Sequence, residues 1–457
     1  MHRNFILFNL FAFLFHSCYA TMHHFWFHIA GECKHISVRL NSFVQILGCL
    51  SIPSAFVWSY LADRTKWHTR IIAINALFYV IASIINFNLR NMTNRYAVQC
   101  GCVLAILLRQ ISAGGTFSIF FALLLNYVKR TNSSNRNVGT AKMFGILGIT
   151  FVMMMLGLSG YLFPSTNARN VALVICVLFG TFSAVLAFFS LPEFVKPEAV
   201  LFKRKISLKD LFKRVYQYMN LIVLAFFLTT VLIGLNRIAL DNFSTSFYHL
   251  LGYEMHHIRL FFCFRMIIEA FALFHSDRLC KFIGLYNLFL LSAVFTVLRT
   301  FILTMFDLLR ASKYRKIFLV CVVEAFKGVS TSAYFYSSTL IFRSFAKYDT
   351  QTLAQGLNGC AYNGVPSVLF SIISVFVTNP QSSKHSDVIT VNEKMQYDYF
   401  LVFFQIVTVL SFFGIIITAV GIYLVKKNKL ENFEWTAHKY PYDVPDYAYP
   451  YDVPDYA

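Results

Sequence analysis

Apolar runs of about twenty residues recur along the whole chain, and they constrain its fold more than any other feature. A helix of that length crosses the hydrocarbon core of a bilayer, which is about 30 Å thick. Lipid offers the backbone no hydrogen-bond partner, so such runs fold as membrane-spanning helices. We predict twelve spans, with the limits Asn4–Ala30, Val38–Leu61, Ile71–Phe87, Val98–Val128, Met143–Phe163, Asn170–Leu191, Met219–Ala239, Glu254–Phe274, Ile283–Met305, Ile317–Phe342, Leu353–Val377 and Tyr399–Val425.

The composition excludes an ordinary soluble domain. Of the 457 residues, 57% are hydrophobic and only 13% are charged. Residues 440–457 repeat YPYDVPDYA, a tandem haemagglutinin epitope tag that takes no part in the fold. Leaving out the four aspartates of the tag raises the formal net charge from +19 to about +23. In a membrane protein, this excess is typical of basic cytoplasmic loops and not of nucleic-acid binding.

A basic hydrophilic segment divides the predicted spans into two sets of six. The predicted division is an N-terminal half (1–191), a cytoplasmic linker (192–218), a C-terminal half (219–430), a tail (431–439) and the tag (440–457). The positive-inside rule places the linker in the cytoplasm, and the even number of spans then places both termini there. The basic cluster Arg310–Lys316, on the opposite side, does not follow the rule.

Two local sequence signals allow further interpretations. The first apolar run has a basic start and Cys18-Tyr19-Ala20 in the position of a signal-peptidase site, but the apolar pattern continues through Phe25-Trp26-Phe27. We therefore favour a first membrane helix over a cleaved signal peptide. The sequons that begin at Asn91 and Asn242 fall on the predicted outer side and are candidates for glycosylation.

Ionisable residues interrupt the apolar runs of the second half. Arg265 and Glu269 share a helix face, Arg299 falls deep in the next run, and Glu324 and Lys327 lie three residues apart. A charge at bilayer depth costs roughly 2.5–3.5 kcal/mol, so it persists where it faces the bundle interior or a water-filled cavity. These residues either form part of a polar pathway, which we favour, or pair only to hold the bundle together.

A charged turn follows the second span, and a similar one occurs at the matching place after the eighth. The first reads Leu61-Ala62-Asp63-Arg64 and the second Ser276-Asp277-Arg278-Leu279. An Asp just past a helix end, beside basic residues, can pair with a neighbouring helix and hold a cytoplasmic gate shut; the alternative is a plain topogenic loop. The first turn resembles the G-x-L-A-D-R-x-G-R-R/K motif of the major facilitator superfamily. Two matching turns indicate internal duplication.

The second half is similar to the branch of that superfamily that contains the oligosaccharide, nucleoside and phenylpropionate proton symporters, the lactose permease-like proteins. The similarity lies in Glu269, Asp277-Arg278, Val297-Leu298-Arg299 and Thr352–Gly359, and Arg109 fits it in the first half. It implies an all-α membrane protein with twelve transmembrane helices in two six-helix halves. It also implies roles in proton coupling or substrate binding for Glu269, Arg299, Glu324 and Lys327, although related proteins often carry a His where this chain has Lys327.

We therefore expect a transporter, not an enzyme, that carries a small polar organic solute by alternating access and proton symport. Arg109, Glu269, Arg299, Glu324 and Lys327 are expected to converge on its cavity. A uniporter and a non-transporting receptor or scaffold are the alternatives. The sequence lacks a G-x-x-x-x-G-K-S/T loop, an H-E-x-x-H or G-x-S-x-G motif and metal-type cysteine spacing, so we expect no cofactor or metal.

The expected partners are the solute, protons and lipid, and the expected state is a monomer. The expected location is a plasma membrane or an internal organelle membrane, with a multi-pass topology. Four glycines of the fifth span are expected to allow close helix packing; these are Gly145, Gly148, Gly157 and Gly160.

Overall fold

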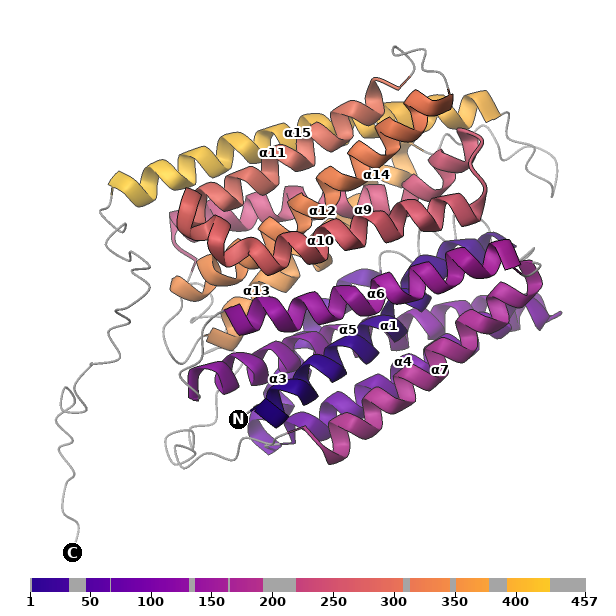
Figure 1. Ribbon diagram of the computed structural model, residues 1–457, viewed down its shortest axis with the longest axis horizontal. Coiled ribbons are helices and arrows are strands. Elements are labelled where there is room, and N and C mark those ends of the chain that lie inside the picture. Colours follow the sequence, from indigo (N-terminus) through magenta and orange to yellow (C-terminus); the bar gives the residue numbers. More distant parts are fainter. Residues whose placement is uncertain are drawn as a thin grey trace, which may run out of the picture.

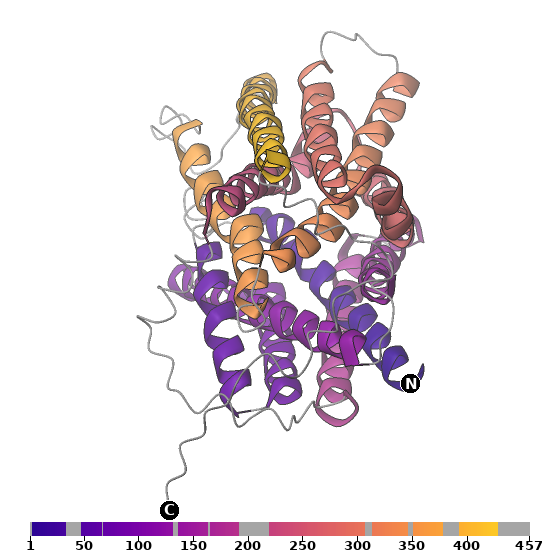
Figure 2. The ribbon, with the colours of Figure 1, turned by 90° about the vertical axis from the view of Figure 1, so that its left-hand side faces the viewer.

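The computed structural model describes residues 2–32, 47–65, 67–130, 136–162, 165–191, 219–306, 313–345, 351–377 and 393–427. All regular elements in these ranges are helical, and they form the two groups visible in Figure 1. Figure 2, turned by 90°, shows the same separation into an N-terminal group and a C-terminal group.

The N-terminal group holds six spanning units. They are α1 (His2–Glu32), η1 (Leu47–Leu50) continuing into α3 (Ser51–Thr65), α4 (His68–Asn88) with the short η2 (Leu89–Asn91), α5 (Arg95–Arg130), α6 (Arg136–Leu162) and α7 (Ser165–Phe189). Each unit overlaps one of the first six predicted spans.

The C-terminal group repeats this number. Its units are α9 (Leu221–Leu250), α10 (Met255–Ile283), α11 (Leu285–Thr304), α12 (Lys313–Ser344), the interrupted helix α13 (Gln351–Gly359), η5 (Cys360–Gly364) and α14 (Val365–Val377), and α15 (Glu393–Lys427). All twelve predicted spans therefore coincide with a helix or with an interrupted helix.

Nine of these helices are long and apolar enough to cross a membrane by length and composition, counting the described residues only. The other three units differ for identifiable reasons. α3 has only 15 residues, the six charged side chains of α10 are spread along most of the helix, from Arg259 to Lys281, and a turn of π-helix, η5, separates α13 from α14. Charge and interruption are thus concentrated in units of the C-terminal half.

The order of helix packing is the same in the two halves. α1 packs on α6 and α7, and α9 packs in the same way on α14 and α15. α4 contacts α5 and α7, while α11 contacts α12 and α15; α3 lies on α5 as α10 lies on α12. The repeated order supports the internal duplication that the two charged turns indicate.

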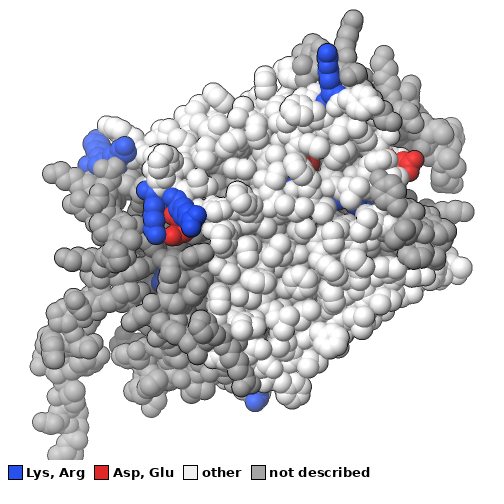
Figure 3. Space-filling view, viewed as in Figure 1, with Lys and Arg blue, Asp and Glu red and all other residues white. Residues whose placement is uncertain are grey.

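The side chains on the outer surface fit a lipid environment. Phe182, Phe189, Phe271 and Tyr423 are each more than half exposed. On the face shown in Figure 3, most described charged atoms lie towards the two ends of the helices, with a broad uncharged surface between them. In a membrane such an uncharged surface can face the lipid directly, without another protein covering it.

Glycines bring α6 close to its neighbours. A Cβ at Gly148 would meet the backbone oxygen of Phe13 in α1, and one at Gly145 would lie 2.8 Å from the ring of His16. A Cβ at Gly157 would lie 3.3 Å from Leu260 of α10. Close packing is confirmed at these three positions, and the surroundings of Gly160 lie outside the described residues.

The two halves meet mainly where α6 packs on α10, and a second contact places α13 against α3 and α5. Two cations cross between the halves. Lys142 of α6 donates to Thr339 Oγ1 at 2.9 Å and to the Phe335 carbonyl at 3.0 Å, both in α12. Arg259 of α10 donates to the Leu156 carbonyl of α6 at 3.0 Å.

Two predicted boundaries are wrong because polar residues continue a helix. α9 runs on to Leu250 and includes Asn242, whose amide nitrogen is buried, so this sequon is not in an outer loop. α10 runs on to Ile283, so Asp277 and Arg278 are helical and not part of a turn. Asn91 is exposed at the end of η2.

Several expectations concern residues outside the described ranges. They include the linker 192–218, residues 310–312 of the basic cluster, the last three residues of the C-terminal half (428–430), the tail (431–439) and the tag (440–457).

Candidate functional site

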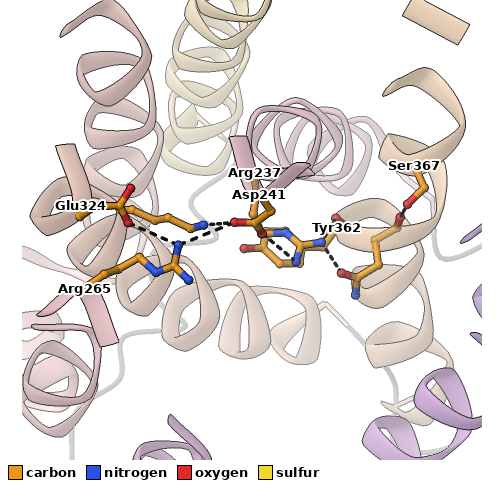
Figure 4. A network of polar contacts seen from close by, with 8 residues as sticks. Arg237, Asp241, Arg265, Glu324, Tyr362 and Ser367 are labelled. Carbon is orange, nitrogen blue, oxygen red and sulfur yellow. Dashed lines mark hydrogen bonds and ion pairs between the residues drawn. The ribbon is translucent and has the colours of Figure 1, made fainter. Parts of the chain in front are cut away.

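Six charged side chains from four helices of the C-terminal half meet in one network. α9 supplies Arg237 and Asp241, four residues apart, and α12 supplies Glu324 and Lys327, three residues apart, so each pair lies on one helix face. α10 adds Arg265 and α11 adds Arg299; most of the network is drawn in Figure 4.

Glu324 lies at one end of the network, and it is fully buried. The hydroxyl of Tyr248 in α9 donates to its Oε1 at 2.7 Å. Arg265 Nη1 lies 3.4 Å from Oε2, and Arg299 Nη2 lies 3.6 Å from Oε1. Groups from three other helices therefore compensate this one carboxylate, as a charge in a dry interior requires.

Asp241 is shared by three cations. Lys327 Nζ pairs with its Oδ1, Arg265 Nη1 lies 3.8 Å from the same oxygen, and Arg237 Nη1 lies 3.9 Å from Oδ2. Arg265 thus bridges Asp241 and Glu324. This bridge makes the network continuous from α9 to α12 (Figure 4).

The interrupted helix formed by α13, η5 and α14 contributes to the same site through η5. Arg237 Nη2 donates to Asn363 Oδ1 at 2.6 Å, and the guanidinium lies 4.4 Å from the centre of the Tyr362 ring. Both partners belong to η5, the turn of π-helix. A Cβ at Gly234 of α9 would meet the backbone oxygen of Tyr362, so α9 and η5 are in close contact. π-Helical turns of this kind are frequent at functional sites.

A small cavity opens beside the network, with about 250 Å³ of empty space when the open solvent at its mouth is included. Its interior has room for about one water molecule, so the cavity is nearly closed in this conformation. Its lining side chains are Ile233, Asn236, Arg237, Thr296, Arg299, Lys327, Ser330, Thr331 and Tyr362.

Glu269 is the exception among the buried charges. Only 3% of it is exposed, yet it makes no ion pair or hydrogen bond with any described residue. Arg265, one turn before it on α10, pairs with Asp241 and Glu324 instead. Arg299 likewise pairs with Glu324 and not with Glu269.

The other predicted site residues lie elsewhere. Arg109 is half-buried on α5 in the N-terminal half, where Tyr79 is an electrostatic neighbour. Asp277 pairs with Lys281 at 2.9 Å and accepts a hydrogen bond from the Tyr336 hydroxyl of α12 at 3.0 Å, while Arg278 is exposed.

The side chains of Asp63 and Arg64, in the last turn of α3, lie outside the described residues.

Sequence reasoning missed Asp241 and Arg237. The predicted seventh span ends at Ala239, which left Asp241 outside the membrane and Arg237 at its edge. Two signals pointed to a longer helix: the spacing of four residues between these two charges, and the aromatic residues that continue to Tyr248. Among the described residues, no three His, Cys, Asp or Glu side chains gather as a metal site requires.

Comparisons with known proteins agree with this architecture. A family model described as "MFS_1 like family" matches residues 5–389. The crystal structure of a mutant of the nucleoside transporter NupG matches with a TM-score of 0.66 and 16% identity, over 91% of this chain and 99% of that chain. A crystal structure of NupG without that mutation gives 0.63 and 15%, over 91% and 98%. No curated protein sequence matches the chain.

At this identity, the likeness to NupG shows the fold alone. It confirms the expected fold class, an all-α membrane protein of twelve helices in two six-helix halves.

Proposed function

We propose a transport mechanism on the premise that the chain belongs to the MFS_1 like family, as the match over residues 5–389 establishes. The protein is a multi-pass membrane transporter and not an enzyme. Our proposal is that it carries a small polar organic solute together with protons, and that the cavity beside Arg299 and Lys327 takes the solute.

The observation that carries the proposal is the environment of Glu324. This carboxylate is fully buried, and Arg265, Arg299 and Tyr248 hold it from three different helices. A proton on Glu324 would remove the charge that attracts the two arginines, so α10 and α11 could then move relative to α12. Such an exchange of a proton for two ion pairs links protonation to a change of conformation.

The cations that hold Glu324 come from other helices. Lys327, one turn away on α12, pairs with Asp241 and not with Glu324. In the proposal, Arg265 and Arg299 hold Glu324.

The same proposal assigns roles to larger parts of the chain. Residues 1–191 and 219–430 are the two halves that rock about the cavity, and residues 192–218 connect them on the cytoplasmic side. The two charged pairs, Asp63-Arg64 near the end of α3 and Asp277-Arg278 near the end of α10, gate the cytoplasmic end. The protein acts as a monomer in a plasma membrane or an internal organelle membrane, with both termini in the cytoplasm.

The test uses the purified protein in liposomes and a labelled solute selected by thermal stabilisation from a metabolite library. Glu324→Gln should abolish accumulation driven by an inward proton gradient but preserve exchange of labelled for unlabelled solute, because exchange needs no net proton release. Glu254→Gln is the matched control, since the Glu254 side chain is 74% exposed at the start of α10.

Other outcomes would contradict the proposal in distinguishable ways. If accumulation in Glu324→Gln remained gradient-driven, proton coupling would have to be reassigned to Glu269. Wild-type uptake that a protonophore does not affect would indicate a uniporter. Binding without flux would indicate a receptor or scaffold.

A further inference from the structure

We infer that the solute is a small organic acid whose carboxylate binds to Arg237 and Arg299. The inference rests on the proposed function, because it names the substrate class of the same cavity. The reasons are the charge balance of the network, the residues that line the cavity and the atoms that remain unpaired there.

The network contains more cations than carboxylates. Arg237, Arg265, Arg299 and Lys327 share only two carboxylates, those of Asp241 and Glu324. The third buried carboxylate, Glu269, makes no ion pair with a described residue, but Arg265 and Arg237 are its electrostatic neighbours. With Glu269 counted, four cations still face only three carboxylates. Burying a charge without an opposite charge beside it costs free energy, so an anion that enters this region would be stabilised there.

The excess positive charge faces the cavity. Three cations line it, Arg237, Arg299 and Lys327, and no carboxylate does among the described residues. With 19% of its side chain exposed, Arg237 is more accessible than Lys327 at 6% or Arg299 at 3%. An entering anion would therefore meet Arg237 first.

Both arginines also carry N–H groups that have no acceptor. Nε and Nη2 of Arg299 and Nε of Arg237 are buried without a hydrogen-bond partner. The nearest carboxylate oxygen to Arg299 Nη2 is Glu324 Oε1, 3.6 Å away, which already accepts from Tyr248. A carboxylate is the group that best satisfies a guanidinium, because its two oxygens accept two parallel N–H bonds.

A further unpaired atom narrows the class of acid. The amide nitrogen of Asn236 donates to Ser411 at 2.9 Å and to Thr300 at 3.3 Å, but its Oδ1 is buried and accepts nothing. Asn236 lines the same cavity, so Oδ1 is available to a donor on the solute. A hydroxyl group beside the carboxylate would supply that donor. The unpaired Oδ1 therefore favours a hydroxy acid as the solute.

The experiment measures thermal stabilisation of the purified full chain by acids and their uncharged counterparts at constant ionic strength. The probes are lactate with its amide lactamide, benzoate with its amide benzamide, and propionate, which lacks the hydroxyl group of lactate. Inorganic phosphate and adenosine are tested as well. We expect at least one acid to bind at least tenfold more tightly than its amide. Lactate should bind more tightly than propionate, and Asn236→Ala should remove that difference.

Variants locate the binding. Arg237→Gln and Arg299→Gln should each weaken acid binding at least tenfold, while Arg315→Gln, at an exposed position of α12, should leave it unchanged. Because Arg299 is deeply buried, elution as a single symmetric size-exclusion peak is required of each variant. Arg237→Gln, at the more exposed position, decides the test if Arg299→Gln fails to fold.

Four results would overturn the inference: equal binding of acids and amides, acid binding that neither arginine variant weakens, stabilisation by phosphate or adenosine alone, and no stabilisation by any acid. Failure of the proposed function looks different. Acid binding without proton-driven uptake would contradict the proposed function but not the inference about the solute. Proton-driven uptake of adenosine without acid binding would contradict the inference but not the proposed function.

Discussion

At the scale of single residues, Asp241 links more of the buried charges than any residue that sequence reasoning selected. It pairs with Lys327, Arg265 and Arg237, which come from three helices. Removing one partner of a buried ion pair leaves the other charge uncompensated, which typically costs about 3–5 kcal/mol. The number of charges left behind therefore sets the cost of each substitution.

We predict that Asp241→Ala destabilises the protein more than Lys327→Ala does. The first change leaves three cations without their shared carboxylate, whereas the second leaves Asp241 with two arginines. The double variant should be less destabilised than the sum of the two single variants, because the two side chains are coupled. Thermal unfolding in detergent measures all three.

Lys281→Ala is the control for this prediction. Its side chain is 60% exposed in a pair with Asp277, so its loss should cost under about 1 kcal/mol. Strictly additive effects of Asp241→Ala and Lys327→Ala would show that the two residues are not coupled.

Part of the site could be predicted at this scale. Arg299, Glu324 and Lys327 were expected to converge, and they lie in one network. Helical spacing places residues on one face of their own helix, but it does not say which other helix that face meets. For this reason the pairing of Lys327 with Asp241, and not with Glu324 on its own helix, could not be predicted.

At the scale of the helices, hydrophobicity located every span but not every end. α9 and α10 continue past the predicted ends through Asp241 and Asp277, because these polar residues have partners inside the bundle. A hydropathy pattern does not show whether a polar side chain has a partner inside the bundle. The predicted ends of both spans therefore fall before Asp241 and Asp277.

The contact between α1 and α6 gives a prediction about packing. Gly148→Ala should destabilise the protein by about 1–3 kcal/mol, because its Cβ meets the Phe13 carbonyl and the backbone of α1 would have to move. Gly414→Ala in α15 is the matched control, since the nearest atom to its Cβ is Leu232 Cβ at 3.5 Å, an ordinary contact. Thermal unfolding compares the two, and equal melting temperatures would contradict the role of Gly148.

The proposed gate gives a prediction about turnover. Asp277 ties α10 to α12 through the Tyr336 hydroxyl and does not line the cavity. Asp277→Asn, and Asp63→Asn at the matching place in the first half, should lower kcat roughly three- to tenfold and leave KM nearly unchanged. Lost substrate binding with a normal rate per bound solute would exclude a gating role for either residue.

At the scale of the whole molecule, polar contacts of described residues join the two halves between α6 and its neighbours α10 and α12. Lys142 reaches α12 and Arg259 reaches α6 across the interface. The charged network, in contrast, lies within the C-terminal half, between α9, α10, α11 and α12. Protonation would thus act first inside one half, and its effect would reach the other half through α10, which packs on α6.

The linker and the even number of spans were enough to predict two halves, but not the helices that join them. The contacts of Lys142 connect residues 193 and 197 positions apart in the chain. No local pattern marks Lys142 as an interface residue. Only the packed arrangement shows which helices of one half meet those of the other.

The orientation of the molecule in the membrane gives the last prediction. α15 ends with Lys426 and Lys427, both exposed, and the positive-inside rule places such an end in the cytoplasm. An antibody to the C-terminal epitope should therefore label cells only after the plasma membrane is permeabilised. Digitonin at a concentration that spares internal membranes should suffice, because a cytoplasmic epitope is then accessible whichever membrane holds the protein. The control is the same epitope inserted between residues 378 and 392, which the predicted topology places on the opposite side of the membrane. If the protein is in an organelle, digitonin should not expose this epitope. If the protein is at the cell surface, the epitope should be labelled without permeabilisation. Labelling of the C-terminal epitope on intact cells would reverse the orientation and, with it, the side on which the gate residues lie.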